Sequence, residues 1–322
     1  MKANLANTLQ ITFVAALVAA AAGMAITAHD NLVRQGIATG FGFLFDRTGW
    51  DVSASFLPHA AADPYWWTFV VGLSNTIVLS LVCIVLATAA GLVLALLGAG
   101  KSRILHGFTR LYIWIFRNIP IIVQVFFWYH VTRQLPPVRQ AFEFLGCCYA
   151  SNRGIYIPHV SVDASLHFEL TLPRLAGFNF VGGTYLSPEF LALAAAIVAY
   201  NIAFVAEIIN SGIRSVPRNQ VEAARIIGLS DQRTFWKITV PQAIRVAVPP
   251  LINQYISLTK SSSLAIAIGY TDLFSVGVIA INHTGQSINV IAVLMLVYLV
   301  ISVGISAAGN AYNRSITARG AR

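Results

Sequence analysis

Charged residues are scarce in this sequence, and their scarcity excludes most classes of soluble protein. Only 10% of the 322 residues are Asp, Glu, Lys or Arg, whereas 57% are hydrophobic. A soluble domain carries charge on about a quarter of its residues. Several apolar runs approach the ~20 residues that a helix needs to cross a bilayer. Because spanning segments must satisfy their backbone hydrogen bonds internally, the composition predicts an all-α integral membrane protein.

Acidic residues are the rarer charged class, and the resulting net charge of +9 raises the question of nucleic-acid binding. The basic residues, however, are clustered. Six Lys or Arg lie from Arg214 to Arg245, against Glu222 and Asp231, whereas residues 30–63 hold four Asp and two Arg. Lys and Arg concentrate in the cytoplasmic loops of membrane proteins. The pattern therefore predicts a cytoplasmic loop at about 212–243 and excludes a nucleic-acid partner.

Cysteine is rare as well, and no motif of an enzyme is present. Cys83 lies in an apolar run, and Cys147 and Cys148 are adjacent in a polar segment. This number and spacing exclude a disulfide framework and a metal site. Residues 98–102 (GAGKS) resemble part of a nucleotide-binding P-loop, but Ala95 stands where the motif needs its first glycine. We expect a chain that is not an enzyme and does not itself hydrolyse ATP.

The apolar runs predict about six transmembrane helices. They lie at about 9–28, 67–98, 106–130, 187–211, 244–268 and 287–311. We interpret the first run as a retained span rather than a signal peptide, because its apolar core is long. Six spans place both termini and every basic cluster on the cytoplasmic side. Residues 131–186 hold no 18-residue apolar run, and we expect an ordered insertion outside the membrane.

The predicted organisation has three parts. Residues 1–66 form an N-terminal transmembrane helix and an extracytoplasmic segment. Residues 67–312 form the transmembrane domain, including the insertion at 131–186 and the loop at 212–243. Residues 313–322 form a basic cytoplasmic tail.

The basic loop holds the most informative motif. Glu222-Ala223-Ala224 is followed by Gly228 and then, after nine residues, by a segment that ends in Pro241. Gly228 suits the C-terminal end of a helix, and Ser230 suits the cap of the next one. Two short helices across a turn form a compact knob whose apolar side needs a partner. The alternative is an amphipathic helix pair on the lipid surface.

The full spacing of this motif resembles the EAA loop of ABC importer permeases, which docks into the ATPase subunit. Other segments are similar to the polar amino-acid (histidine, glutamine, arginine and opine) class. They are residues 116–124 (FRNIPIIVQ), 206–207 (AE), 212–217 (GIRSVP), 241–245 (PQAIR), 249–254 (PPLINQ) and 260–264 (KSSSL). The flanking segments 34–44, 154–158 and 177–183 resemble one branch, the general L-amino-acid permeases.

This resemblance implies a type I ABC importer permease fold and a subunit that carries L-amino acids into the cytoplasm. It implies partner ATPase subunits that bind ATP and Mg²⁺, a second permease subunit and a periplasmic amino-acid-binding protein. It also implies the bacterial inner membrane and the surrounding lipid as the setting. The extra N-terminal span and the long insertion favour a paralogue over an identical copy as the second permease.

Ionisable side chains within the spans indicate candidate residues of the substrate path, because each costs about 2.5–3.5 kcal/mol at mid-bilayer. Lys260, with Ser261, Ser262 and Ser263, offers a cation and hydroxyl donors for a substrate carboxylate. Alternatively, Lys260 snorkels or pairs with Glu207. Arg117 has three alternatives: it snorkels, lines the path or pairs with Glu207. Gln124 is a further candidate residue for lining the substrate path.

A different class of function remains open from the residues alone. An ion-coupled secondary transporter or a channel would act without an ATPase. Such folds tend to contain inverted repeats with matched broken helices, whereas only residues 249–263 show an interruption of this kind. A protein acting alone also has no need of a 30-residue basic docking loop.

Overall fold

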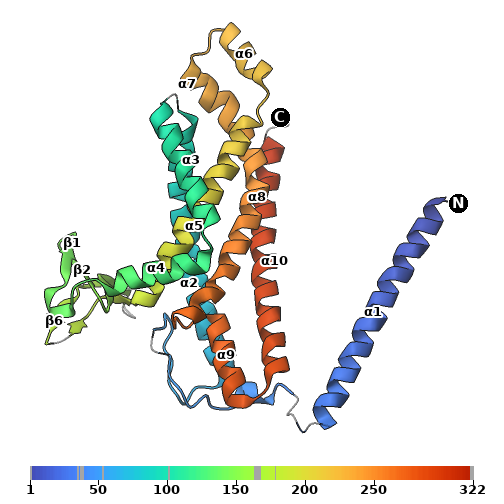
Figure 1. The fold of residues 1–322 in the computed structure, drawn as a ribbon, viewed down its shortest axis with the longest axis vertical. Helices are drawn as coiled ribbons and strands as arrows, with labels where there is room; N and C mark the ends of the chain where they lie inside the picture. The colour runs from blue at the N-terminus through green and yellow to red at the C-terminus, as the bar shows by residue number, and fades with distance from the viewer. Residues whose placement is uncertain are drawn as a thin grey trace.

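The computed structural model describes residues 2–34, 36, 40–52, 54–100, 102–162, 168–177 and 179–319, and it is mostly helical (Figure 1). The long helices are α1 (Lys2–Arg34), α2 (Tyr65–Ala99), α5 (Pro188–Arg214), α8 (Val240–Lys260) and α10 (Ser287–Arg319). The shorter ones are α3 (Arg103–Asn118), α4 (Ile121–Arg133), α6 (Arg218–Ile226), α7 (Asp231–Thr234) and α9 (Leu273–Thr284). Between them lie three 3-10 turns, η1 (Gly42–Phe45), η2 (Val138–Gln140) and η4 (Ser261–Ala267), and one π-helix, η3 (Phe235–Thr239).

Among the described residues, three helices are long and apolar enough to cross a membrane: α2, α5 and α10. A fourth span results if α3 and α4 are counted as one. The sequence predicted about six. The difference arises in α1, whose apolar core is confined to Thr8–Met24, and in α8, which carries Arg245, Asn253 and Lys260. The molecule is therefore a mostly helical membrane protein with three to four strongly apolar spans.

The span expected at 106–130 is broken into α3 and α4, which meet at an angle of 101°. The break falls at Ile119 and Pro120, both of which have extended backbone. A proline lacks the N–H that a helix interior needs, and it disfavours helical geometry in the residue before it. Pro249 and Pro250 behave differently, since α8 continues through them and gives way to η4 only at Ser261.

The insertion contains β-structure, so the expectation of an all-α protein is wrong for this segment. Strands β1 (Phe142–Phe144), β2 (Cys148–Ser151), β3 (Gly154–Ile157) and β8 (Thr184–Leu186) form an antiparallel sheet in that order. Two hairpins pair β4 (His159–Val162) with β5 (Phe168–Thr171) and β6 (Arg174–Ala176) with β7 (Asn179–Val181). Short aromatic and β-branched runs separated by glycine turns favour strands. Gly182 and Gly183 supply such a turn, each with a positive φ.

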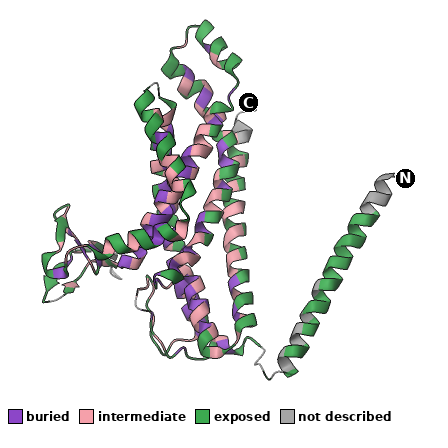
Figure 2. Ribbon diagram, in the orientation of Figure 1, coloured by how far each residue is buried: buried purple, intermediate pink, exposed green. Residues whose placement is uncertain are grey.

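The helices pack closely around α5 (Figure 2). The largest buried cluster joins α2, α4, α5 and η4, and it includes Leu79, Val125 and Ile197. A glycine allows α2 to approach α5, because a Cβ on Gly91 would lie 2.6 Å from a methyl carbon of Val205. Helix α1 lies apart from the other helices in Figure 1. The core of the protein is therefore built around α5, with α2, α4 and α8 packed against it.

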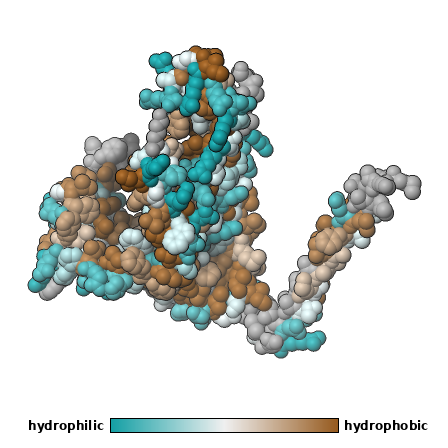
Figure 3. All heavy atoms as spheres, turned by 45° about the horizontal axis from the view of Figure 1, so that its top comes forward, coloured by the Kyte–Doolittle hydropathy of each residue, from teal (hydrophilic) through white to brown (hydrophobic). Residues whose placement is uncertain are grey.

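Helix α5 fixes which parts of the chain lie on opposite sides of the membrane. It begins just after β8 and ends just before α6, so its 27 residues separate the insertion from the basic loop by about 40 Å. Ser187 caps its first turn by accepting a hydrogen bond from the backbone N–H of Phe190. Hydrophobic residues cover much of the helical body, and hydrophilic ones gather at the end that carries α6 and α7 (Figure 3).

Candidate functional site

The basic loop folds into a knob made of α6, α7 and the turn between them. Helix α6 carries Glu222, Ala223 and Ala224, and it ends two residues before Gly228. Gly228 has a φ of +88°, which L side chains rarely adopt. Ser230 then caps α7 by accepting a hydrogen bond from the backbone N–H of Arg233. The predicted turn and cap are confirmed, and Pro241 follows in the first turn of α8.

The knob presents a surface of both charged and small apolar residues to solvent. Ala224 is buried, whereas Glu222, Ala223, Gly228 and Pro241 are exposed. The Nε of Arg225 lies 3.1 Å from the carboxylate of Asp231, which ties α6 to α7 across the turn.

Its tip is apolar. Ile226 and Ile227 are 85% and 78% exposed. An exposed apolar patch marks a surface that contacts either a protein partner or a membrane.

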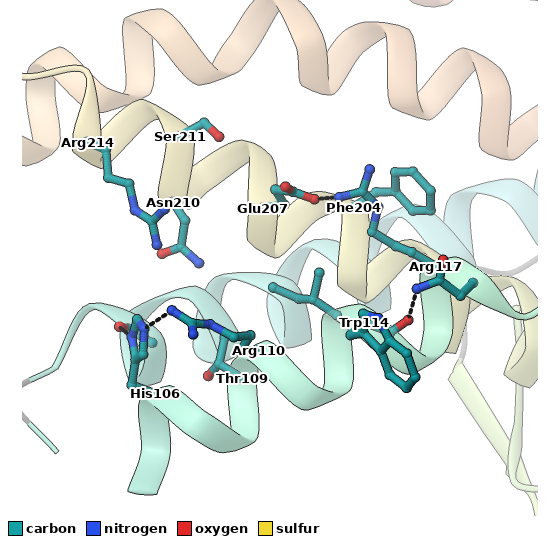
Figure 4. Close-up of a pocket in the computed structure, with 13 residues that line it drawn as sticks. His106, Thr109, Arg110, Trp114, Arg117, Phe204, Glu207, Asn210, Ser211 and Arg214 are labelled. Atoms are coloured by element: carbon teal, nitrogen blue, oxygen red, sulfur yellow. Dashed lines mark hydrogen bonds and ion pairs between the residues drawn. The ribbon is translucent and has the colours of Figure 1, made fainter. Parts of the chain in front are cut away.

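A second feature is a polar cavity between α3 and α5 (Figure 4). It has a volume of about 550 Å³. Arg117 on α3 forms an ion pair with Glu207 on α5, and its guanidinium carbon lies 4.9 Å from the centre of the Phe204 ring. Of the three alternatives for Arg117, the structure thus shows the pair with Glu207, within a cavity that both residues line. Stacking on an aromatic face adds about 0.5–1 kcal/mol at an exposed site.

The rest of the cavity is basic. Arg110 and Arg214 line it together with Arg117, whereas Glu207 is the acidic residue among its described lining residues. The Nδ1–H of His106 donates to the carbonyl oxygen of Gly98 at 2.9 Å, which leaves Nε2 to accept from Arg110 at 3.2 Å. This contact holds Arg110 in the N-terminal half of α3. Three guanidinium groups against one carboxylate favour an anionic group in the cavity.

Gln124 lies elsewhere, at the bend between α3 and α4. Its side chain is buried, and its amide nitrogen donates to the carbonyl oxygens of Phe116 and Ile119, each at 3.1 Å. Those carbonyls are left over at the C-terminal end of α3, where no further helical turn can satisfy them. Gln124 therefore fastens the bend, and it is absent from the residues that line the cavity.

The structure separates Lys260 and the three serines from this cavity. Lys260 is the last residue of α8 and is exposed, and no ion pair of Lys260 is found among the described residues. Ser261 and Ser263 donate to backbone carbonyls of their own turn. Ser262 is fully buried and donates to Asp272 at 3.2 Å. The alternative in which Lys260 pairs with Glu207 is not what the structure shows, because Glu207 pairs with Arg117.

Asp272 is a buried carboxylate that the sequence reasoning missed. It caps α9 by accepting from the backbone N–H and the hydroxyl of Ser275, at 2.9 and 2.8 Å. It also accepts from Ser262 and from the hydroxyl of Tyr298 on α10, at 3.2 and 3.4 Å. The signal was present, because an Asp directly before an apolar run is a typical helix cap. Asp272 thereby joins η4, α9 and α10.

A further polar contact joins the two central helices. The side-chain amide of Gln254 on α8 donates to the side-chain oxygen of Asn201 on α5, at 2.7 Å. Asn201 in turn donates to the carbonyl oxygen of Ile197. Gln254 therefore joins two helices, and it is absent from the residues that line the cavity.

The comparisons with known proteins decide the family. The family model described as "Binding-protein-dependent transport system inner membrane component" matches residues 87–319. The chain belongs to this family. It is 37% identical to the putative amino-acid ABC transporter permease protein YhdX of Escherichia coli, over 95% of this chain and 93% of YhdX. It is 32% identical to the general L-amino acid transport system permease protein AapQ of Rhizobium johnstonii, over 88% of this chain and 85% of AapQ.

A solved structure shares the fold. The crystal structure of an amino acid ABC transporter with histidines has a TM-score of 0.58 at 23% identity, and the match covers 78% of this chain and 95% of that one. The family expected from the EAA-like motif is thus confirmed. The chain is a multi-pass inner-membrane permease of a transport system that works with a binding protein, and it is a transport subunit rather than an enzyme.

Proposed function

We propose that this permease carries amino acids into the cytoplasm as one subunit of an ABC importer. The relatives named above are amino-acid permeases. The cavity between α3 and α5 suits such a substrate, because its guanidinium groups match a carboxylate and Glu207 matches an ammonium group. One observation carries the proposal: the knob directly follows α5, which lines the cavity, and Glu207 is only 11 residues before the start of α6.

The knob is the coupling surface for an ATPase subunit. Glu222 offers a charge to a cation of the partner, Ala223 allows close approach, and Ile226 supplies apolar contact. Gly228 sets the turn, and Pro241 lies where the knob joins α8. ATP and Mg²⁺ bind in the partner. Closure of the ATPases then shifts the knob and, through α5 and α8, the balance between two packings of the helices.

In this proposal α1 and α8 complete six spans, together with α2, the α3–α4 pair, α5 and α10. The knob and both termini face the cytoplasm, and the insertion at 131–186 faces the periplasm of a bacterium. Residues 29–66 and 131–186 enlarge the surface that meets the binding protein. The tail from 313 continues α10 as far as Arg319, so Arg314 lies at the cytoplasmic end of that helix.

A second permease, a paralogue rather than an identical copy, completes the path. Arg117 and Glu207 line the path in this chain, whereas Gln124 fixes the bend that positions Arg117. Lys260 is exposed and faces the partner permease, with Ser261 and Ser263 beside it; Ser262 holds the segment on Asp272.

The experiment is uptake into proteoliposomes that contain this chain, its co-purified subunits and the binding protein. We expect uptake of labelled amino acids that needs both ATP and the binding protein. Gly228→Asp places a carboxylate in the turn, and we expect it to abolish uptake while the protein stays in the membrane. Uptake at the wild-type rate in this variant would contradict docking through the knob. Transport by the chain alone, without ATP, would favour an ion-coupled transporter instead.

A further inference from the structure

A second polar pocket lies at the other end of α5, where the insertion meets the helices. Its volume is about 470 Å³, and it lies between the end of α4, the start of α5 and strands of the insertion. Arg133 comes from α4, Glu189 from α5 and Arg153 from the turn before β3. None of the three is buried. The pocket is therefore open to small molecules on the side of the membrane opposite the knob.

The wall of this pocket is a stack of aromatic rings. Tyr156 lies between Phe180 and Tyr185, with ring centres 4.6 and 5.3 Å away. The hydroxyl of Tyr185 donates to the carbonyl oxygen of Arg153 at 2.8 Å. Burial, together with nearby Tyr156 and Glu189, raises the pKa of Tyr185 to about 12, so the hydroxyl remains a donor at neutral pH. The wall is thus firmly placed, and it positions the turn that carries Arg153.

The charged groups of the pocket retain unused hydrogen-bonding capacity. Arg153 donates through one nitrogen to Asn179 at 3.1 Å, and Arg133 donates to the carbonyl oxygen of Asn152 at 3.4 Å. A guanidinium has five N–H donors, so both arginines can bind a carboxylate as well. Glu189 accepts from the hydroxyl of Tyr129 through one oxygen, at 3.3 Å. Two cations and one anion match a ligand with two carboxylates and one ammonium group.

The pocket, here called the outer pocket, is also aligned with the cavity between α3 and α5, here called the inner cavity. Glu189 and Glu207 are 18 residues apart on α5, which is five turns of an α-helix. Both residues therefore lie on one face of α5, about 27 Å apart along the helix axis. Each lies in a pocket with an excess of arginine. The same charge arrangement thus occurs at two depths along one helix face.

We propose that the outer pocket is a binding site for an acidic amino acid. Arg133 and Arg153 bind its two carboxylates, Glu189 binds its ammonium group, and Tyr156 and Tyr185 contact its carbon chain. The site accepts the substrate on the outer side before the substrate reaches the inner cavity on the same face of α5. This inference rests on the proposed function, because it names a substrate class and an entry point for it.

The test measures equilibrium binding of tritiated L-glutamate to the full-length chain and its co-purified subunits in nanodiscs, without the binding protein. We expect saturable binding that Arg153→Met weakens at least tenfold, which corresponds to about 1.4 kcal/mol. Arg153→Lys retains the charge and should restore part of the affinity. Arg174→Met is the matched control, since Arg174 lies on β6 of the same insertion but outside the pocket. L-aspartate should compete with the label, and L-arginine should not.

Three results would overturn the inference. They are the absence of saturable binding, an Arg153→Met variant that binds like the wild type, and a variant that loses only its affinity for the binding protein. The last result would make the pocket part of a protein docking surface. Arg117→Met separates the two cavities, because it alters the inner one and leaves the outer one intact. If ATP-driven uptake persists without glutamate binding, only this inference fails; if glutamate binds but no amino acid is taken up, the proposed function fails.

Discussion

Replacing Gly228 by alanine should weaken docking of the ATPase without disturbing the rest of the permease. Nothing lies within 4 Å of the position where a Cβ on Gly228 would stand, so a methyl group has room. The cost lies in the backbone alone, because φ is +88° there. An L-residue in a left-handed conformation costs about 1–2 kcal/mol. Asparagine tolerates this region better than alanine.

The contacts around the turn are too weak to hold it against that strain. The ion pair between Arg225 and Asp231 has both side chains more than half exposed, and a pair of this kind contributes about 0–1 kcal/mol. A strain of about 1–2 kcal/mol should therefore lower the fraction of knobs in the docking conformation. Since 1.4 kcal/mol is tenfold, the expected loss of affinity for the ATPase is roughly 5- to 30-fold.

The assay is the affinity of the purified ATPase subunit for the permease in nanodiscs, compared across Gly228→Ala, Gly228→Asn and Gly107→Ala. Gly107 lies on α3 with open space around it, and its substitution should leave docking unchanged. Gly228→Asn should fall between wild type and Gly228→Ala. Equal affinities for wild type and Gly228→Ala would refute the role of the positive φ. Equal losses in both Gly228 variants would indicate that any side chain at this position obstructs the partner.

Three further predictions concern the helical body. Arg117→Met leaves the carboxylate of Glu207 without its partner. The double variant that also carries Glu207→Gln should therefore reach the membrane in larger amounts than Arg117→Met alone. Equal amounts would argue against a functional pair. Asp272→Ala removes a helix cap, which costs about 0.5–2 kcal/mol of stability, and it also removes the contacts with Ser262 and Tyr298. The melting temperature in detergent should therefore fall further than for Asp272→Asn. Gly91→Ala forces a clash with α5 that should lower stability by about 1–3 kcal/mol, again measured by thermal unfolding. The control Gly107→Ala should not destabilise the protein. Equal melting temperatures for the two variants would show that α2 moves away from α5 freely.

Local backbone chemistry explains which parts of the fold were predictable. Ser187 and Ser230 each cap a helix as expected, because a cap depends on residues three positions away. Gly228 likewise ends its helix with a positive φ. The pairing of Arg117 with Glu207 was one of several alternatives, since the residues are 90 positions apart in the chain and only tertiary packing brings them together.

Other features depend on contacts that no short segment specifies. The strands of the insertion are three to four residues long, too short for a clear alternation of apolar and polar residues. Lys260 was one candidate for the substrate path, and that role stays a prediction, because a position along the fifth span does not specify the face of the helix on which a side chain lies. The cap that Asp272 forms on α9 was a local signal, but its contacts with Ser262 and Tyr298 depend on two other elements.

The π-helix between α7 and α8 has a mechanical consequence. The backbone is right-handed helical at Thr234, Phe235, Thr239 and Val240, so α7, η3 and α8 form one uninterrupted helix from Asp231 to Lys260. Its 30 residues make a rod of about 45 Å at the helical rise. A rotation of this rod by a few degrees about its knob end would displace its other end, at Lys260, by a few ångströms. If a partner moves the knob, as proposed above, the movement therefore reaches the turn after α8, which Asp272 holds through Ser262.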